Sequence, residues 1–160
     1  MTRHMLTGCF TALVTPFDAA GAVDFDALGK LVDWQVAEGI HGLVPVGSTG
    51  EAATLTLEER VAVVRLCAER AAGRVPVMAG ASANDTRVAI ETSKAMAGTG
   101  ATQLLHASPA YSKPPQRGII AHFRAVADAS PLPVVVYNVP GRTASNVEAA
   151  TTLALAEHQN

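Results

Sequence analysis

The chain has 160 residues, of which 49% are hydrophobic and 16% are charged, a composition too apolar for intrinsic disorder. Its 12 basic and 14 acidic residues give a net charge of −2, and the scattered basic residues form no patch for nucleic acid or an acidic membrane surface. No segment reaches the ~18 consecutive apolar residues of a membrane span, and the N-terminal stretch lacks the apolar core of a secretory signal.

Short apolar runs recur along the chain, and most of them lack polar alternation, which is typical of strands buried on both faces of a parallel sheet. The expected strands are Phe10–Val14, Leu43–Val46, Val75–Ala79, Gln103–Ala107 and Val134–Tyr137. Pro45 is unfavourable within the second run, because proline has no N–H to donate to a ladder.

Stretches of helical period separate and follow these runs. Asp24 or Asp26 is the expected cap of the first helix, and Gly39 its stop. Its expected buried stripe is Phe25, Leu28, Leu31, Val32 and Val36. The second helix opens with a capping box at Thr56-Leu57-Glu58-Glu59.

Three further helices are expected. One begins at Asn84 or Asp85, one covers about 116–129, and a last one begins near Asn146. The inward positions expected for the last helix are Val147, Ala150, Leu153 and Ala154.

The strand centres lie 31, 33, 28 and 31 residues apart, which is the length of one βα unit repeated. A closed barrel of eight such units needs ~250 residues. A doubly wound sheet is the alternative, but Thr15-Pro16-Phe17 after the first strand carries no phosphate-binding glycine motif. We therefore expect an α/β fold of the TIM (β/α)8-barrel type, with about the first five βα units present in one partial barrel domain, residues 1–160.

Polar and aromatic residues gather in the segments after the expected strands, where a parallel barrel carries its reactive groups. Ser48 and Thr49 follow the second strand between glycines, and their hydroxyls and amides suit a carboxylate. Tyr111 follows the fourth strand, Tyr137 ends the fifth, and Arg142 is a natural clamp for a carboxylate. Structural alternatives remain open for each of these residues. Ser48 and Thr49 could form a turn with a helix cap, Tyr111 could pack at an interface, and Arg142 could be a solvated surface side chain.

Two segments carry a specific resemblance: Gly42 to Glu51 (GLVPVGSTGE) and Tyr137 to Thr143 (YNVPGRT). With support from 11–17 and 108–111, the chain resembles the pyruvate-dependent class I aldolase family of dihydrodipicolinate synthase and N-acetylneuraminate lyase. The segment 140–143 looks more like the synthase.

The resemblance implies a role for each of these side chains. Ser48 and Thr49 would receive the carboxylate of pyruvate, and the Thr49 hydroxyl would link Tyr137 to Tyr111 in a proton relay. Tyr137 would be the general acid/base, Tyr111 would be lent across a dimer interface, and Arg142 would hold the carboxylate of aspartate semialdehyde. The family is commonly a homo-oligomer, often a tetramer, and uses no cofactor.

The chemistry of this family needs a lysine amine that forms an imine with pyruvate. In the family that lysine follows the fifth-strand tyrosine by about one βα period, so we expect this chain to end before its nucleophile. The three lysines that it contains, Lys30, Lys94 and Lys113, are interpreted as solvated surface charges.

The expected function is therefore that of a dihydrodipicolinate synthase-like lyase of lysine and diaminopimelate biosynthesis, which condenses pyruvate with aspartate semialdehyde. This chain would carry the N-terminal substrate-binding part. A sister 2-oxo acid lyase of the N-acetylneuraminate lyase type, and a non-catalytic truncated remnant that keeps a carboxylate pocket, remain open alternatives.

Neither the five histidines nor the cysteines have a metal-ligand spacing, so no metal is expected, and His106 is interpreted as a hydrogen-bonded structural histidine. Cys9 and Cys67 are interpreted as reduced thiols of a cytoplasmic protein. In relatives that lysine inhibits, the resemblance places its ligands where this chain has Leu57, Arg60, Val88 and Ala110, and only Asn84 is kept. We expect no tight feedback by lysine.

Overall fold

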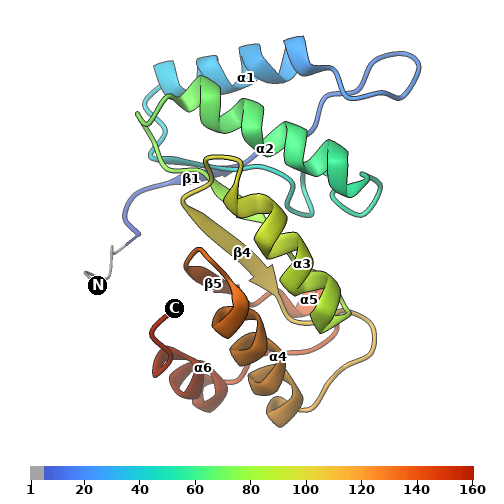
Figure 1. The fold of residues 1–160 in the computed structure, drawn as a ribbon, viewed down its shortest axis with the longest axis vertical. Helices are drawn as coiled ribbons and strands as arrows, with labels where there is room; N and C mark the ends of the chain where they lie inside the picture. Colours follow the sequence, from blue (N-terminus) through green and yellow to red (C-terminus); the bar gives the residue numbers. More distant parts are fainter. Residues whose placement is uncertain (1–5) are drawn as a thin grey trace.

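The computed structural model describes residues 6–160, so His4 and the start of the N-terminal stretch considered above lie outside the described residues. Strands and helices alternate along the chain (Figure 1). They are β1 (Phe10–Ala12), α1 (Phe25–Ala37), β2 (Gly42–Val44), α2 (Leu57–Ala71), β3 (Met78–Gly80), α3 (Thr86–Ala97), β4 (Gln103–Ala107), α4 (Gln116–Ala129), β5 (Val134–Tyr137), α5 (Pro140–Thr143) and α6 (Ala149–Ala156).

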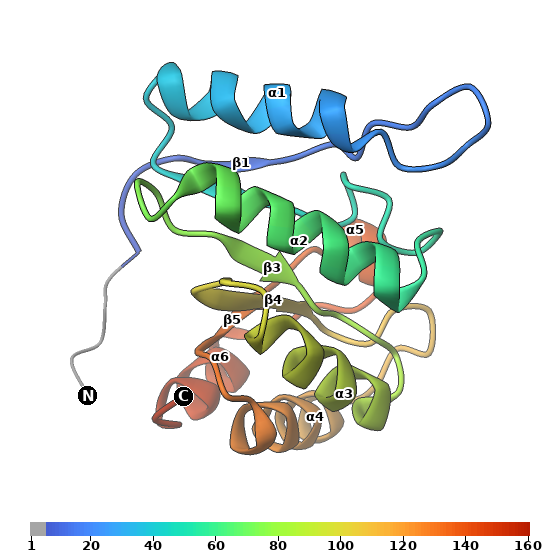
Figure 2. The ribbon, with the colours of Figure 1, turned by 45° about the horizontal axis from the view of Figure 1, so that its top comes forward.

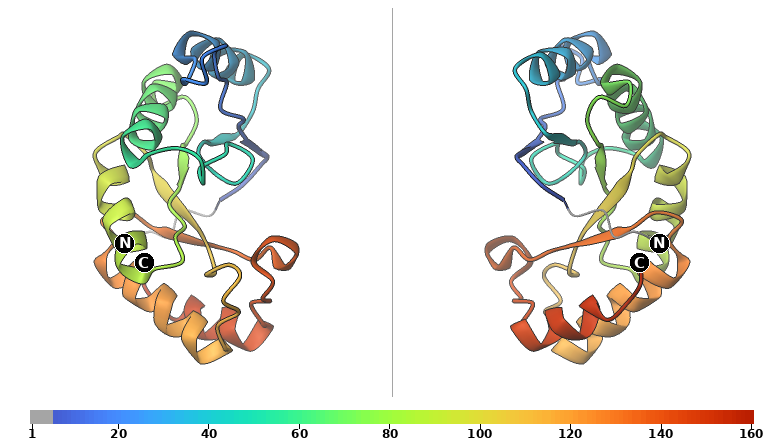
Figure 3. Two further views of the ribbon diagram at one scale, coloured as in Figure 1. Left: turned by 90° about the vertical axis from the view of Figure 1, so that its right-hand side faces the viewer. Right: turned by 90° about the vertical axis from the view of Figure 1, so that its left-hand side faces the viewer.

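All strand pairs are parallel, and neighbours in space are neighbours in sequence. β1 pairs with β2, β3 with β4 and β4 with β5, and a single bridge between Leu43 and Val77 joins the two groups. Figure 2 shows β3 and β4 side by side, and Figure 3 shows the helices in an arc on the outer side of the strands. A doubly wound sheet reverses its strand order at a switch point, and β1–β5 do not. The expected partial (β/α) barrel is therefore confirmed.

The main core lies between the strands and the helices that cover them. Leu28 and Val32 of α1, Val64 of α2 and Leu104 of β4 are fully buried. A second cluster joins α4, α6 and the segment between α5 and α6 through Ile119, Phe123, Val147 and Leu155. Burial of each large aliphatic side chain contributes about 1.5–3 kcal/mol, so these contacts hold the helices against the sheet.

α1, α2 and α3 begin at capping residues that the sequence predicts. Asp24 accepts a hydrogen bond from the backbone N–H of Ala27 (2.9 Å). Thr56 and Glu59 form the reciprocal capping box, with N···O distances of 2.8 and 3.2 Å. Asp85 caps α3. Each cap satisfies N–H groups that the first turn of a helix leaves without partners.

Several expected boundaries and faces are wrong in detail. β2 ends at Val44, so Pro45 lies outside the ladder and removes no hydrogen bond from it. Phe25 is 41% exposed, because it lies at the first turn of α1, beyond the edge of the buried stripe. α6 begins at Ala149 and buries Thr151 and Leu155, whereas Leu153 is 70% exposed.

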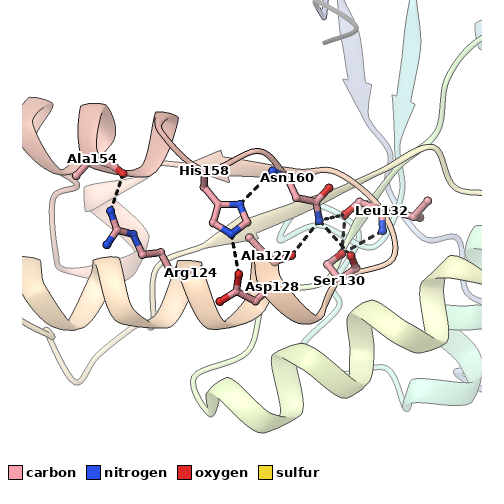
Figure 4. A network of polar contacts seen from close by, with 8 residues as sticks. All are labelled: Arg124, Ala127, Asp128, Ser130, Leu132, Ala154, His158 and Asn160. Atoms are coloured by element: carbon pink, nitrogen blue, oxygen red, sulfur yellow. Dashed lines mark hydrogen bonds and ion pairs between the residues drawn. The ribbon is translucent and has the colours of Figure 1, made fainter. Parts of the chain in front are cut away.

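A polar network fixes the segment after α6 to the end of α4 and to the turn before β5 (Figure 4). The Asn160 side-chain amide donates to the carbonyls of Ala127 (3.0 Å) and Ser130 (3.1 Å). The Asn160 carbonyl accepts from the N–H of Val134 at the start of β5 (2.8 Å). The network therefore satisfies carbonyls at the turn between α4 and β5.

Within residues 6–160, no helix combines the length and the apolar character that crossing a bilayer requires. Cys9 is exposed and Cys67 is buried, and both are free thiols. Burial raises the pKa of the Cys67 thiol to about 12, so this side chain packs as a neutral apolar group.

Candidate active site

The segments that follow β2, β3, β4 and β5 surround one cavity of about 490 Å³. This volume lies in the range of about 300–1,000 Å³ that is usual for small-molecule sites. Ser48, Tyr137 and Arg142 all line it. The structure therefore brings three of the five predicted site residues, from three different segments of the chain, to the same cavity.

The segment that carries Ser48 has a constrained backbone. Val46 and Glu51 have φ values of +49° and +55°, which are unfavourable for residues with a side chain. The Thr15 hydroxyl donates to the Gly50 carbonyl (2.7 Å), and a Cβ at residue 50 would stand 2.9 Å from the Leu13 carbonyl oxygen. The residues that follow β1 therefore pack against this segment and require glycine at position 50.

The hydrogen-bond donors of Ser48 and Thr49 are uncommitted. Neither their hydroxyls nor their backbone N–H groups bond to another group within residues 6–160. Both residues are exposed, although only Ser48 lines the cavity. A constrained turn with free O–H and N–H donors is suited to binding a carboxylate.

Tyr137 and Arg142 come from β5 and the short helix α5, which the sequence did not predict as a helix. Tyr137 is the last residue of β5, in register with Ala107 of β4, and is 38% exposed. Asn138 fixes the following segment, because its side chain donates to Asn146 Oδ1 (2.8 Å) and accepts from the N–H of Val147 (3.0 Å). The Tyr137 phenol and the Arg142 guanidinium bond to no other group in the described chain, which leaves both free for a ligand.

Tyr111 lies outside the cavity. It is 91% exposed and has a φ of +69°, and its backbone N–H donates to the Thr143 carbonyl (3.1 Å). The next residue back, Ala110, donates its N–H to Asn84 Oδ1 (2.8 Å). No hydrogen bond joins Thr49, Tyr137 and Tyr111 in the described chain, so the predicted relay is not assembled within a single copy.

Arg60 lines the cavity from the first turns of α2, and the sequence did not predict it as a site residue. Its Nη2 donates to the Gly80 carbonyl (3.1 Å), whereas its Nε is buried without a partner. Burial lowers the pKa of this guanidinium from its usual value. The available signal was the resemblance, which places a ligand of the lysine-inhibited relatives at this position.

None of the chain's lysines reaches the cavity. Lys30, Lys94 and Lys113 are all exposed, and none of them lines it. Within residues 6–160, no three His, Cys, Asp or Glu side chains are grouped so that they could hold a metal ion. The cavity therefore offers hydroxyl, phenol, amide and guanidinium groups.

His106 is buried on the helix-facing side of β4 and does not line the cavity. Its Nε2 lies 3.1 Å from the Ser93 hydroxyl. Burial, and to a lesser extent the charges of His122 and Arg60, lower the pKa of His106 to about 4. It is therefore a neutral, hydrogen-bonded structural side chain near pH 7.

Comparison with known proteins gives relatives for nearly the whole chain. Residues 5–160 match the model of the dihydrodipicolinate synthetase family. A 4-hydroxy-tetrahydrodipicolinate synthase of Pseudoalteromonas atlantica is 49% identical over 154 residues, which are 96% of this chain and 53% of that protein. One of Sphingopyxis alaskensis is 52% identical over 153 residues, which are 96% of this chain and 52% of that protein.

Solved structures agree with these matches. The dihydrodipicolinate synthase of Acinetobacter baumannii, crystallised with pyruvate, superposes with a TM-score of 0.93 at 43% identity, over 96% of this chain and 53% of that one. The enzyme of Cyanidioschyzon merolae, with lysine bound, gives a TM-score of 0.90 at 44% identity, over 94% of this chain and 51% of that one.

The chain thus spans about half the length of the curated relatives it matches, and the matched part is their N-terminal half. Both the order of its βα units and its sequence agree with those relatives throughout that part. On these grounds the chain belongs to the dihydrodipicolinate synthetase family.

Proposed function

We propose that this chain carries the pyruvate-binding part of a lyase of the 4-hydroxy-tetrahydrodipicolinate synthase type, acting in the cytoplasm in lysine and diaminopimelate biosynthesis. The reaction is the condensation of pyruvate with aspartate semialdehyde through a lysine imine. The observation that supports this most directly is the meeting of Ser48, Tyr137 and Arg142 at one cavity, with none of their side chains bonded elsewhere in the described chain.

Each group has a role that fits its chemistry. The free donors of Ser48 and Thr49 bind the carboxylate of pyruvate. The Tyr137 phenol gives and takes the protons that imine formation and release require. The Arg142 guanidinium holds the carboxylate of the aldehyde substrate through its paired N–H groups.

The imine step needs an amine that is neutral near pH 7, which requires desolvation or a neighbouring cation. Lys30, Lys94 and Lys113 are exposed and lie outside the cavity. We therefore expect the reactive amine in the half of the relatives' length that this chain does not match.

Tyr111 is assigned to a contact between copies of the chain. Two hydrogen bonds hold its segment: the Ala110 N–H donates to Asn84 Oδ1, and the Tyr111 N–H donates to the Thr143 carbonyl. The Tyr111 side chain is 91% exposed and does not line the cavity of its own chain. A rigid, outward-pointing tyrosine completes the relay with Thr49 and Tyr137 only when a second copy brings it in. The proposal therefore includes a homo-oligomer, as in the family.

The test is a titration of the 15N-labelled 160-residue chain with sodium pyruvate at pH 7.5. We expect saturable shifts of the Ser48 and Thr49 amide signals, and Ser48→Ala to weaken the affinity about tenfold, since it removes one hydrogen bond to a charged group. Ser112→Ala, an exposed serine outside the cavity, is the matched control. Equal pyruvate affinity in Ser48→Ala and the unaltered chain would contradict the proposal.

A second measurement separates the lyase from its alternatives. Borohydride treatment in the presence of pyruvate is expected to leave the intact mass of this chain unchanged, since Lys30, Lys94 and Lys113 are exposed and lie outside the cavity. A pyruvate adduct on one of them would contradict the assignment of the amine. Kinetics with aspartate semialdehyde and N-acetylmannosamine, on this chain joined to the remaining half of a relative, distinguish the synthase from a sister lyase.

A further inference from the structure

The short helix that carries Arg142 needs support from the residues around it. α5 covers only Pro140–Thr143, and no side chain caps its N-terminus. The chain leaves it at Ala144, whose φ of +58° lies in the left-handed region. A single helical turn is not stable by itself and forms only where the rest of the fold holds it. The direction in which Arg142 points therefore depends on the contacts that fix this turn.

Thr143 makes such a contact from inside the turn. It is the buried residue of α5, at 2% exposed. Its hydroxyl donates to the Ser145 carbonyl (2.8 Å), and the Ser145 N–H donates back to the same oxygen (3.4 Å). One hydroxyl proton serves one acceptor at a time, so the longer contact with the Val139 carbonyl (3.3 Å) is an alternative to the bond with Ser145. The Thr143 side chain therefore closes the turn across Ala144.

The turn is also attached to the segment that follows β4. The Thr143 carbonyl accepts from the Tyr111 N–H (3.1 Å), and the Ser145 hydroxyl lies 3.2 Å from the Ser108 hydroxyl. Ser108 is 4% exposed and lines the cavity. Thr143 lines the cavity too, but its hydroxyl and its carbonyl are both bonded within the protein. Thr143 and Ser145 thus join α5 to a neighbouring part of the cavity wall.

Arg142, directly before Thr143, has the opposite character. It is exposed and lines the cavity, and within residues 6–160 no group bonds to its guanidinium. A carboxylate that binds through two parallel N–H groups needs the planar fork of the arginine to be aimed correctly. A fixed backbone at Arg142 leaves less ordering for the ligand to impose, which favours binding.

We propose that the Thr143 hydroxyl positions Arg142: by closing the turn onto Ser145, it directs the guanidinium towards a carboxylate in the cavity. This inference rests on the proposed function for the role of Arg142 and adds a positioning residue to it. A threonine that only fills space could be replaced by valine without a loss of binding, because the two differ by a methyl group in place of the hydroxyl.

The test is the affinity for sodium succinate, a stable four-carbon carboxylate, followed at the Arg142 signals of the 15N-labelled 160-residue chain at constant ionic strength. We expect Thr143→Val to weaken binding about tenfold, the order expected when a hydrogen bond to a charged group is lost. Thr143→Ser restores the hydroxyl and is expected to bind nearly as tightly as the unaltered chain. Equal affinity in Thr143→Val and Thr143→Ser would overturn the proposal.

Thr99→Val is the matched control for the loss of a buried hydroxyl. Thr99 is 4% exposed, its hydroxyl donates to the Met96 carbonyl (2.6 Å), and it does not line the cavity. Both valine variants are expected to lower the free energy of unfolding in urea, but only Thr143→Val to weaken succinate binding. The same succinate affinity in both variants would show that the Thr143 hydroxyl has a structural role alone, against the proposal.

A double-mutant cycle separates positioning of Arg142 from a general loosening of the cavity. In an Arg142→Gln background, Thr143→Val is expected to cause no further loss of succinate affinity, because a positioning residue acts through the side chain that it positions. A further loss as large as in the unaltered chain contradicts that action. If Thr143→Val does not keep a folded spectrum, Thr143→Ala replaces it, since alanine removes the hydroxyl without placing a methyl group against the Ser145 carbonyl.

The pyruvate titration of the unaltered chain separates this inference from the proposed function. Absence of pyruvate binding, with a succinate affinity that follows the Thr143 hydroxyl, counts against the proposed function alone. Saturable pyruvate binding at Ser48 and Thr49, with one succinate affinity in all the Thr143 variants, counts against the positioning role alone.

Discussion

Gly80, the last residue of β3, lies so close to Val46 that a Cβ on residue 80 would stand 2.1 Å from the Val46 carbonyl oxygen. The Gly80 N–H also donates to the Pro45 carbonyl (3.0 Å). Val46 is buried with a positive φ, and it leads directly into Gly47 and Ser48. The shape of the proposed carboxylate-binding segment therefore depends on the absence of a side chain in the neighbouring strand.

Gly80→Ala is expected to destabilise the chain by about 1–3 kcal/mol, the usual cost of forcing an extra carbon into a packed site. The contact is with backbone, so Val46 must move and carry Ser48 with it, and pyruvate binding should weaken as well. Urea unfolding and the pyruvate titration measure the two effects. Gly98→Ala is the control, because that position has open space and no positive φ; similar behaviour of both variants would contradict the prediction.

Asn138→Ala is expected to loosen the segment that carries Arg142. The Asn138 side chain donates to Asn146 and accepts from the Val147 N–H, so its removal leaves a backbone donor without a partner, at a cost of about 1–3 kcal/mol. Hydrogen exchange should accelerate at the Val147 amide, and the urea midpoint should fall. Asn138→Asp keeps the acceptor for Val147, so slow exchange at Val147 should persist there; fast exchange in both variants speaks against the assigned bond.

The order of the elements was predictable from the sequence, because buried strands appear as apolar runs and helix starts as capping residues. β4 and β5 were predicted with their observed bounds, since each is a short, mainly apolar run between loop residues. Thr56 and Glu59 predicted the start of α2, because a capping box depends only on residues three positions apart. β2 is shorter than its apolar run, since Val46 has a positive φ and leads into the segment that carries Ser48. β3 begins only at Met78, within the predicted run.

Features that depend on contacts between distant segments were not predictable. Leu153 was expected inside, but the face that α6 buries is decided by its packing on α4, and an apolar helix gives little sign of which face that is. The helical pattern around Arg60 did not show that its guanidinium reaches the cavity wall, where it donates to the Gly80 carbonyl. Thr49 and Tyr111 are on the predicted segments, yet the cavity lining does not include them.

Acidification between pH 6.5 and 4 is expected to destabilise the chain because of His106. Its pKa is about 4 in the folded chain, against 6.5 for an unperturbed histidine, and desolvation is the main cause. In this window the unfolded chain binds a proton that the folded chain does not, so stability falls as pH falls, by on the order of 3 kcal/mol in total. His122, whose pKa burial also lowers, adds to the same slope.

The measurement is the free energy of unfolding in urea at several values between pH 7.5 and 4. Hydrogen bonds with Arg87 lower the pKa of Asp85 to about 2. Its effect on stability is therefore lost mainly below pH 4 and does not mask the pH dependence that His106 causes. His106→Asn should reduce the slope and leave the part due to His122. A slope unchanged by His106→Asn excludes this histidine as its source.

Asn160→Ala is expected to weaken the attachment of the segment after α6 (Figure 4). The Asn160 amide donates to the carbonyls of Ala127, Ser130 and Leu132, at 3.0, 3.1 and 3.3 Å, and these carbonyls lose that donor in the variant. The free energy of unfolding is expected to fall by about 1–3 kcal/mol, because these half-buried carbonyls lose their hydrogen-bond donor and water replaces it only in part.

The backbone bond from Val134 to Asn160 does not require the side chain, so hydrogen exchange at the Val134 amide reports whether the segment stays in place. We expect faster exchange at Val134 in Asn160→Ala and a lower urea midpoint, while Gln159→Ala, a change at the exposed neighbour, alters neither. Unchanged protection of Val134 in Asn160→Ala would show that the Asn160 side chain does not hold the segment. In that case packing of Leu155 against Phe123 is sufficient to hold α6 against α4.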